Sequence, residues 1–353
     1  MIHLEYIWLG GKDEFRSKSK IMKKADMGTI SGWNELHRCI GLENIPEWNY
    51  DGSSTEQAFG LDTEVILSPV KVIPSPFPLN VNCRLKCISN CNCNCTSYLV
   101  LCETFRYDDN LNRVPLFDRS AREIFQKNPD LKPWFGLEQE YFMVGESIPN
   151  QLVQGPYYCG VGGKHPIERN IALEHLEACL GSGLEISGIN AEVAHCQWEF
   201  QIGPCVGIDA ADQLLFARYI LERIAEKYGI SILYDPKPFP QVNGSGCHVN
   251  FSTEEMRQEE GLRKIEECIH KLSAKHQEVI SVSGKNNHLR LTGIHETSSM
   301  DAFTWGIGTR HTSIRIPNGV FKEKKGYFED RRFAANVNPY LATSLLFKIC
   351  CID

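Results

Sequence analysis

Two runs of alternating polar and apolar side chains constrain the fold of this chain most. Residues 134–142 read Trp-Phe-Gly-Leu-Glu-Gln-Glu-Tyr-Phe, and residues 197–204 read Gln-Trp-Glu-Phe-Gln-Ile-Gly-Pro. Because successive side chains of a strand point to opposite faces, Glu138 and Glu140 share one face of the first run, and Glu199 lies opposite the aromatic face of the second. Each run therefore predicts a strand with one face on a core and one acidic face on a cleft.

The acidic faces need either a counter-charge or solvent. Carboxylates two residues apart on one strand face repel each other unless a cation lies between them, and hard carboxylate oxygens suit Mg²⁺ or Mn²⁺. Glu192, seven residues before Glu199, can join them only if a turn intervenes. A solvated edge strand is the alternative for the first run, and a half-exposed amphipathic strand is the alternative for the second, so the alternation alone leaves both interpretations open.

Residues 243–252, Asn-Gly-Ser-Gly-Cys-His-Val-Asn-Phe-Ser, join a glycine-rich loop to a third alternating run. Gly244 and Gly246 allow the backbone to approach a ligand closely. His248 then begins a polar strand face that it shares with Asn250. A lone histidine is more often structural than a ligand, but its position after a glycine-rich loop favours a ligand here.

Two further segments carry arginines on polar strand faces. Arg315 alternates with apolar neighbours, and Tyr327, Glu329 and Arg331 share one face of the run at 326–332. Arginine forks match phosphate and carboxylate geometry, although a surface salt bridge explains either segment taken alone. Together with the carboxylates and the histidine, these segments favour a two-metal, nucleotide-handling site. Spacing alone does not show that the segments converge.

The rest of the sequence predicts an α+β protein of two domains. Its 353 residues suit one large and one smaller domain, and a loop at 108–115 divides a domain at 1–110 from a domain at 111–353. Strands are expected in the first domain at 5–9, 65–68 and 98–105. Helices are expected in the second at 170–180, at 209–228 with Asp209 as cap, and from near Ser252, where Ser252 and Glu255 fit a capping box.

Composition and charge limit the possible binding partners of the protein and its cellular compartment. A net charge of −7 offers no global basic field for nucleic acid, and no apolar stretch is long enough to predict a membrane span. The 15 cysteines are an odd number spread over the chain, which favours reduced thiols in the cytoplasm. The cysteine-rich run at 83–95 lacks the paired spacing of zinc sites. We interpret it as a low-complexity surface insertion, with a metal or redox cluster as the alternative.

Six motifs in order resemble those of eukaryotic-type (type II) glutamine synthetases, and the match covers nearly the whole chain. They lie at residues 46–55, 133–141, 197–204, 243–248, 291–298 and 325–332. The resemblance implies an N-terminal β-grasp domain and a larger catalytic domain, an antiparallel sheet with flanking helices. It also implies a ring oligomer, usually a decamer of two stacked pentamers, with active sites between neighbouring subunits.

The resemblance further implies roles residue by residue. One divalent metal, Mg²⁺ or Mn²⁺, would be held by Glu140, Glu192 and Glu199, and another by Glu138, His248 and Glu329. Glutamate and the transferring phosphate would contact Asn243, Gly244, Arg290, Arg310, Arg315 and Arg331. ATP would contact Trp134, Glu199, Asn250, Phe251, Ser252, Arg315 and Tyr327. Asp51 would bind ammonium, and Glu296 would lie on a flap that closes over the intermediate.

The implied activity is ATP-dependent ligation of ammonia to the γ-carboxylate of L-glutamate through a γ-glutamyl phosphate. A carboxylate is a poor acyl donor, so ATP activates it first, while arginines and metals neutralise the moving phosphoryl group. A noncatalytic glutamine-synthetase-like protein with a structural or binding role is one alternative, and a ligase for another amine is a second. The complete set of ligand types favours the ligase, and the Asp51 motif with Glu296 favours ammonia.

The chain departs from the family pattern in a few segments. Additional residues at 25–39 and 78–96 lengthen loops of the first domain. Ala-His-Cys at 194–196 stands where the family usually has Met-Pro-Gly or Met-Pro-Ala, and Val242 stands where it has a tryptophan. Without the proline, we expect a looser turn before the Gln-Trp-Glu run.

Overall fold

The computed structural model describes residues 1–23, 40–77, 79, 96–127, 129–146, 154–155, 157–162 and 166–353. The lengthened segment at 25–39 and nearly all of that at 78–96, including the cysteine-rich run at 83–95, lie outside these residues. The chain divides into two compact units, residues 1–118 with 181–183, and residues 119–180 with 184–353. The domain division at residue 110 stays a prediction.

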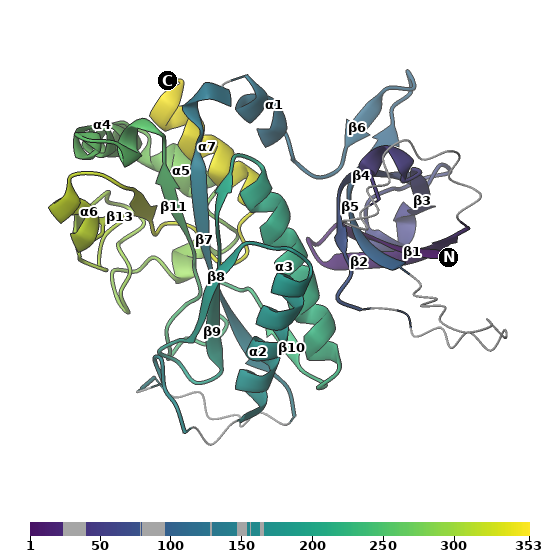
Figure 1. Ribbon diagram of the computed structural model, residues 1–353, viewed down its shortest axis with the longest axis horizontal. Helices are drawn as coiled ribbons and strands as arrows, with labels where there is room; N and C mark the ends of the chain where they lie inside the picture. Colours follow the sequence, from purple (N-terminus) through teal and green to yellow (C-terminus); the bar gives the residue numbers. More distant parts are fainter. Residues whose placement is uncertain are drawn as a thin grey trace, which may run out of the picture. The chain divides into compact units, whose positions relative to one another are not determined.

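The first unit is built on a mixed sheet with the strand order β2-β1-β5-β4-β3, and β6 pairs with β5 (Figure 1). β1 and β5 run parallel at its centre, and the other pairs are antiparallel. Alternate residues of β1, such as Leu4 and Tyr6, are buried with Val100 of β5 in its core. The strands are β1 (Ile2–Leu9), β2 (Phe15–Met22), β3 (Trp48–Asp51), β4 (Glu64–Pro74), β5 (Thr96–Tyr107) and β6 (Arg113–Pro115).

The second unit contains a larger sheet with the order β12-β13-β14-β11-β7-β9-β8, and β10 pairs with β7. The pairs are antiparallel except for β12 and β13, which run parallel. The strands are β7 (Trp134–Val144), β8 (Ile186–Ala191), β9 (Gln197–Val206), β10 (Ser231–Leu233), β11 (Cys247–Ser252), β12 (Trp305–Ile307), β13 (Ile314–Ile316) and β14 (Phe328–Asp330). Both alternating runs thus form neighbouring strands of one sheet.

Helices α2 and α3 lie along the sheet beside β8 and β9 (Figure 1). The last helix, α7, starts where the Asn338 side chain accepts hydrogen bonds from the backbone of Tyr340 and Leu341, with Pro339 in its first turn. The helices are α1 (Ala121–Gln126), α2 (Pro166–Gly181), α3 (Asp209–Glu226), α4 (Gly261–Ala274), α5 (His276–Ser281), α6 (Asn318–Glu323) and α7 (Pro339–Cys351). No helix among the described residues has the length and apolarity to cross a bilayer.

The α+β fold class is confirmed, but one helix start and one helix cap were predicted wrongly. β11 extends through Ser252, and α4 begins only at Gly261. Thr253, rather than Ser252, accepts a hydrogen bond from a backbone N–H three residues on, and that bond closes a single short turn. Asp209 starts α3 without capping it, because its carboxylate accepts a hydrogen bond from the Gln213 side chain one turn along.

Candidate active site

Strand register brings acidic residues of separate strands together. β7 pairs with β9 so that Glu140 lies opposite Glu199, and it pairs with β11 so that Glu138 lies opposite His248. β14 follows on the other side of β11 and carries Glu329. Because directly opposed residues of neighbouring strands share a face, one face of the sheet collects these side chains.

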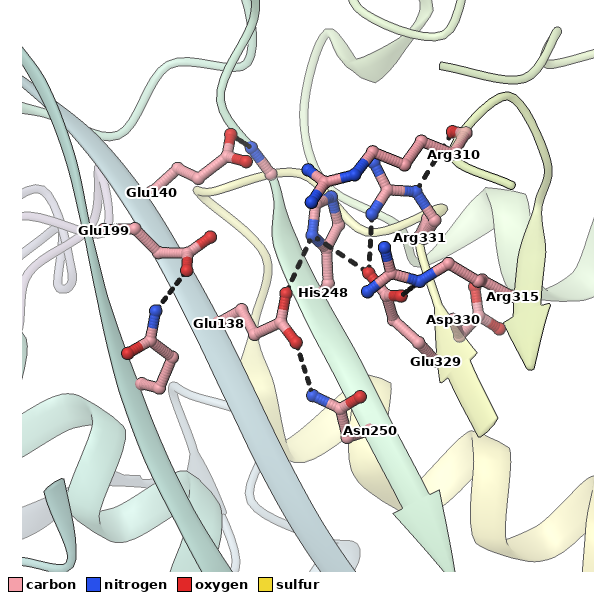
Figure 2. Close-up of polar contacts among 12 residues, drawn as sticks. Glu138, Glu140, Glu199, His248, Asn250, Arg310, Arg315, Glu329, Asp330 and Arg331 are labelled. Atoms are coloured by element: carbon pink, nitrogen blue, oxygen red, sulfur yellow. Dashed lines mark hydrogen bonds and ion pairs between the residues drawn. The ribbon is translucent and has the colours of Figure 1, made fainter. Parts of the chain in front are cut away.

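Three of these residues form a metal-type cluster at the centre of Figure 2. His248 Nδ1 lies 3.4 Å from Glu138 Oε2 and 3.5 Å from Glu329 Oε1, and three ligand atoms, one from each residue, lie within 4.8 Å of one another. The Asn250 side-chain amide donates a 2.8 Å hydrogen bond to the other oxygen of Glu138 and so orients that carboxylate. These are the three residues that the resemblance implies for one metal.

A second cluster joins Glu140 and Glu199 to the same histidine, His248, again with ligand atoms within 4.8 Å. The backbone N–H of Gly246 donates a 2.7 Å hydrogen bond to Glu140 Oε2. A Cβ atom at Gly246 would lie 2.5 Å from an Arg290 nitrogen and 2.8 Å from His248 Nε2. Only glycine therefore lets the loop before β11 pass this close to the cluster.

Glu192 lines the same cavity but is not part of that second cluster. Its carboxylate accepts hydrogen bonds from the Asn190 side chain at 2.9 Å and from the backbone N–H of Val193 at 3.3 Å. The second cluster therefore contains His248 in the place where Glu192 was expected. The Glu192 carboxylate is instead hydrogen-bonded to its own neighbours, Asn190 and Val193. The assignment of Glu192 as a metal ligand remains a prediction.

Crowding of buried acids in this cleft raises their pKa values. Burial and nearby Glu192 raise the pKa of Glu140 to about 8, and burial with the neighbouring carboxylates holds the pKa of Glu199 well above its usual range. Burial lowers the pKa of His248 well below its usual value. A divalent cation favours ionised carboxylates and a neutral imidazole. This donor set of carboxylate oxygens and one imidazole therefore fits Mg²⁺ or Mn²⁺.

Arginines surround the acidic clusters. Glu329 is fully buried and forms ion pairs with Arg315 and with Arg331, whose Nη1 lies 2.6 Å from it (Figure 2). Buried Arg290 lies with Nη2 3.0 Å from His248 Nε2 and donates to the backbone carbonyl of Arg331. Positive charge therefore borders the cluster on the side of β13 and β14.

Two of the arginines connect this border to the segment that carries Glu296. Arg331 donates to the backbone carbonyls of Glu296 and Arg310 at 3.3 and 3.2 Å. Arg310 itself lies 3.9 Å from the Glu296 carboxylate, and both side chains are more than two-fifths exposed. Glu296 has a φ of 62°, which is rare for a residue with a side chain.

Two adjoining cavities share Glu138 and Gln201. The charged cavity is about 320 Å³ and is lined by the four arginines, Asn243, Gly244, Glu296 and every cluster residue except the fully buried Glu329. The second, mainly apolar cavity is about 440 Å³ and includes Trp134, Asn250, Phe251, Ser252 and Tyr327, five residues expected along ATP. Glu199 and Arg315, also expected along ATP, line the charged cavity instead.

Asp51 belongs to the first unit, where it ends β3. It begins a short turn in which its carboxylate accepts hydrogen bonds from the backbone and hydroxyl of Ser53 at 3.0 and 2.8 Å. These hydrogen bonds lower the pKa of Asp51. The side chain is exposed, and the lowered pKa favours its ionised form.

Several lining residues were missed by the sequence reasoning. Arg257 packs its guanidinium 3.9 Å from the centre of the Trp134 ring at the apolar cavity, and Tyr158 faces Arg310 at the charged one. Both come from segments without periodic pattern, so nothing in the sequence marked them. Asn190 could have been predicted from the sequence. It lies two positions before Glu192, and alternate residues of an extended segment share a face.

The departures from the family pattern leave the turn before β9 closed. The N–H of Glu192 donates to the carbonyl of Gln197 at 2.8 Å, and Gln197 N–H donates to Ala194. Ala194 and Val242 are both fully buried in one apolar cluster with Phe142. Two substituted positions thus pack against each other, and hydrogen bonding closes the turn in place of proline.

Comparison with known proteins agrees with this architecture. The family described as glutamine synthetase, catalytic domain, matches residues 121–350. The chain is 47% identical to a putative glutamine synthetase of Acanthamoeba polyphaga mimivirus, over 99% of this chain and 94% of that protein. It is 44% identical to glutamine synthetase of Saccharomyces cerevisiae, over 98% and 88%, and 44% identical to a glutamine synthetase cytosolic isozyme of Pinus sylvestris, over 97% and 91%. The chain therefore belongs to the glutamine synthetase family.

Proposed function

We propose that this chain is a glutamate–ammonia ligase that forms glutamine, ADP and phosphate from L-glutamate, ammonia and ATP. The observation that carries the proposal is the pair of adjoining cavities: an apolar one sized for a nucleoside, and a charged one with carboxylates, a histidine and four arginines. A nucleotide that spans both places its base against Trp134 and its phosphates among the arginines. Such positioning of a transferring phosphoryl group is the main requirement of this chemistry.

In the charged cavity, arginines bind the anionic groups. Arg290, with Asn243 and Gly244, is suited to the carboxylates of glutamate, because Arg290 is buried and its guanidinium reaches into the cavity. Arg315 and Arg331 stabilise negative charge on the phosphoryl group as it moves to the γ-carboxylate. Arg310 extends this positive border on the more exposed side.

Two or more divalent cations, Mg²⁺ or Mn²⁺, would be held by Glu138, His248 and Glu329 and by Glu140 and Glu199, with Glu192 as a further oxygen donor. When bound, they supply charge neutralisation for the nucleotide phosphates. The protein residues contribute orientation: Asn250 and Gly246 hold two of the carboxylates by hydrogen bonds.

Asp51 and Glu296 serve the second half of the reaction. Ammonium is not a nucleophile, so a carboxylate must bind it and another base must remove a proton. We assign ammonium binding to Asp51 and the closing flap to the segment that carries Glu296. Because an acyl phosphate hydrolyses readily, the flap must also exclude water.

We further propose that the chain acts in the cytoplasm as a ring oligomer, a decamer of two pentamers, in which Asp51 of one subunit serves the site of its neighbour. Similarity to a cytosolic isozyme supports the location. Asp51 lies in a different unit from the clusters, which supports a site shared between subunits.

The test is ATP- and ammonia-dependent glutamine formation with Mg²⁺, with unaltered protein and with Glu329→Ala compared after both are shown to fold and assemble. We expect glutamine from the unaltered chain and a loss of at least about a thousand-fold in the variant, because the variant loses a metal-type ligand and the partner of two arginines. Well-folded, assembled, unaltered protein that forms no glutamine would indicate a noncatalytic role. Turnover with another amine alone would indicate a related ligase.

A further inference from the structure

A second group of metal-type ligands lies at the turn between β8 and β9. His195 and Cys196 of this turn converge with Glu168 from the first turn of α2. Cys196 Sγ lies 3.3 Å from Glu168 Oε1 and 3.1 Å from His195 Nδ1. The three ligand atoms lie within 4.8 Å of one another. The sulfur-containing donor set sets this group apart from the oxygen-rich clusters of the cleft.

All three side chains are buried: Glu168 is 3% exposed, His195 3% and Cys196 5%. Glu168 Oε2 has no hydrogen-bond partner among the residues that the structure describes. An ionised carboxylate that is buried with one orphaned oxygen costs free energy unless a positive group compensates it. The first turn of α2 favours negative charge through the helix dipole, but it leaves that oxygen without a hydrogen bond.

Hydrogen bonding within the group leaves one oxygen unsatisfied. The Cys196 thiol donates to Glu168 Oε1, and its sulfur can accept a weak hydrogen bond from His195 Nδ1 in the tautomer that carries the proton there. Neither contact reaches Glu168 Oε2. A metal ion would engage the carboxylate, the thiolate and the imidazole together, because it accepts lone pairs from all three.

The spacing of the ligand atoms suits a tetrahedral ion. Zinc bond lengths of about 2.3 Å to sulfur and about 2.0–2.1 Å to nitrogen or oxygen place ligand atoms roughly 3.5 Å apart. The separations of 3.3 and 3.1 Å from Cys196 Sγ therefore need to widen by only a few tenths of an ångström. The His195 ring must also turn to direct one nitrogen at the ion, because its Nε2 lies 3.7 Å from the same sulfur. Cys196 also has a φ of 62°, a conformation that favours glycine. Its thiol occupies the turn despite this backbone cost.

We propose that Glu168, His195 and Cys196 form a site for a borderline-soft divalent transition metal, Zn²⁺ in chemical class, with one position left for a further ligand. Thiolate and imidazole select such ions over Mg²⁺. The bound ion ties α2 to the turn that follows Glu192, which is the turn that lacks a proline. The inference concerns residues outside the charged cavity and stands whether or not the chain makes glutamine.

The experiment uses the full chain, stripped of metals by a chelator and then saturated with Mg²⁺ to fill the oxygen-rich clusters. Titration with Co²⁺ is followed by absorption, because a thiolate ligand gives a charge-transfer band that oxygen and nitrogen ligands do not. We expect one equivalent per chain to produce this band, and Zn²⁺ to abolish it by displacement. Absence of the band in the unaltered chain would overturn the proposal and leave only a hydrogen-bonded group.

Variants assign the ligands. Cys196→Ser should remove the band and weaken metal binding at least about a hundred-fold, and Glu168→Gln should keep the band with binding weakened about ten-fold or more. Cys159→Ser, at an exposed cysteine outside the group, is the matched control and should bind as the unaltered chain does. A band that survives Cys196→Ser contradicts the assignment. X-ray absorption of the unaltered, zinc-loaded protein needs no variant: one sulfur neighbour supports the site, and none refutes it.

Discussion

The two faces of β7 and β9 handle buried polar groups in different ways. The cleft face holds Glu138, Glu140 and Glu199, whose charges crowd one another. The opposite face holds Leu137 and Phe200, which are at most 1% exposed. It packs against α3, and His175 of α2 lies against the Phe200 ring (Figure 1). One face therefore carries crowded carboxylates, and the other is packed and largely hydrogen-bonded within the chain, with His175 Nδ1 left without a hydrogen-bond partner among the described residues.

The polar groups of the packed face illustrate this difference. Buried Arg218 of α3 donates to Gln139 Oε1 at 2.5 and 2.8 Å and to two backbone carbonyls near residue 335. His175 of α2 lies with Nε2 3.0 Å from the carbonyl of Ala217. Neighbouring positions on one strand thus line the charged cavity when they face the cleft and contact helix side chains when they face the other way.

The largest effect is expected from a cleft-face charge. Glu140→Gln keeps the shape of the side chain but removes a charge from the second cluster, so glutamine formation should fall about a thousand-fold with little change in thermal stability. Calorimetric titration with Mn²⁺ should show weaker binding. Glu146→Gln, at an exposed position just beyond β7, is the control. Full activity in Glu140→Gln would remove Glu140 from the metal site.

On the packed face, the largest loss should be in stability. Arg218→Met removes the donor to Gln139 Oε1 and to the Val337 carbonyl and leaves the Ala335 carbonyl with Gln139 alone, so the free energy of unfolding should fall by about 4 kcal/mol. Urea unfolding measures this. Arg263→Met on α4, whose side chain is 71% exposed, should change it by less than about 1 kcal/mol. Equal losses in both variants would show that Arg218 is not structurally special.

A pH series tests the histidine of the packed face. Burial lowers the pKa of His175 from 6.5 to about 4. Between these values the unfolded chain binds the extra proton, so the contribution of His175 is complete above pH 6.5 and is lost as the pH falls toward 4. The loss should reach about 3 kcal/mol. Unfolding of His175→Gln should be less dependent on pH, whereas that of His270→Gln, at an exposed position, should match the unaltered chain. If the stability of His175→Gln changed with pH as steeply as that of the unaltered chain, His175 would not be the source of the pH dependence.

The smallest effect is expected at the entrance of the apolar cavity. Trp134→Ala removes the partner of Arg257 and a wall of the proposed nucleotide site, so the KM for ATP should rise about five-fold. The KM for glutamate and kcat should stay within two-fold or so of the unaltered values. Trp305→Ala, at an exposed tryptophan that does not line this cavity, is the control. A larger rise in the KM for glutamate than in the KM for ATP would indicate that the apolar cavity binds glutamate rather than the nucleotide.

Much of this comparison was visible in the sequence. Period-two alternation predicted which residues of β7, β9 and β11 share a face, since that period is a local property of extended chains. The capping pattern at Ser252 failed because β11 continues through that residue to pair with β7. Strand pairing outweighed the local capping signal. A side-chain hydroxyl does accept a hydrogen bond from a backbone N–H three residues on, but that hydroxyl belongs to Thr253 rather than to Ser252.

The sequence by itself determined the alternation, the family and the identity of the charged residues that face the cleft. The tertiary structure decided which of them meet: that His248 lies between two carboxylate clusters, that Glu192 is held by Asn190, and that Glu168 reaches Cys196. The reason is physical. Alternation depends only on neighbouring residues, whereas these contacts depend on strand register and helix packing between residues far apart in the chain.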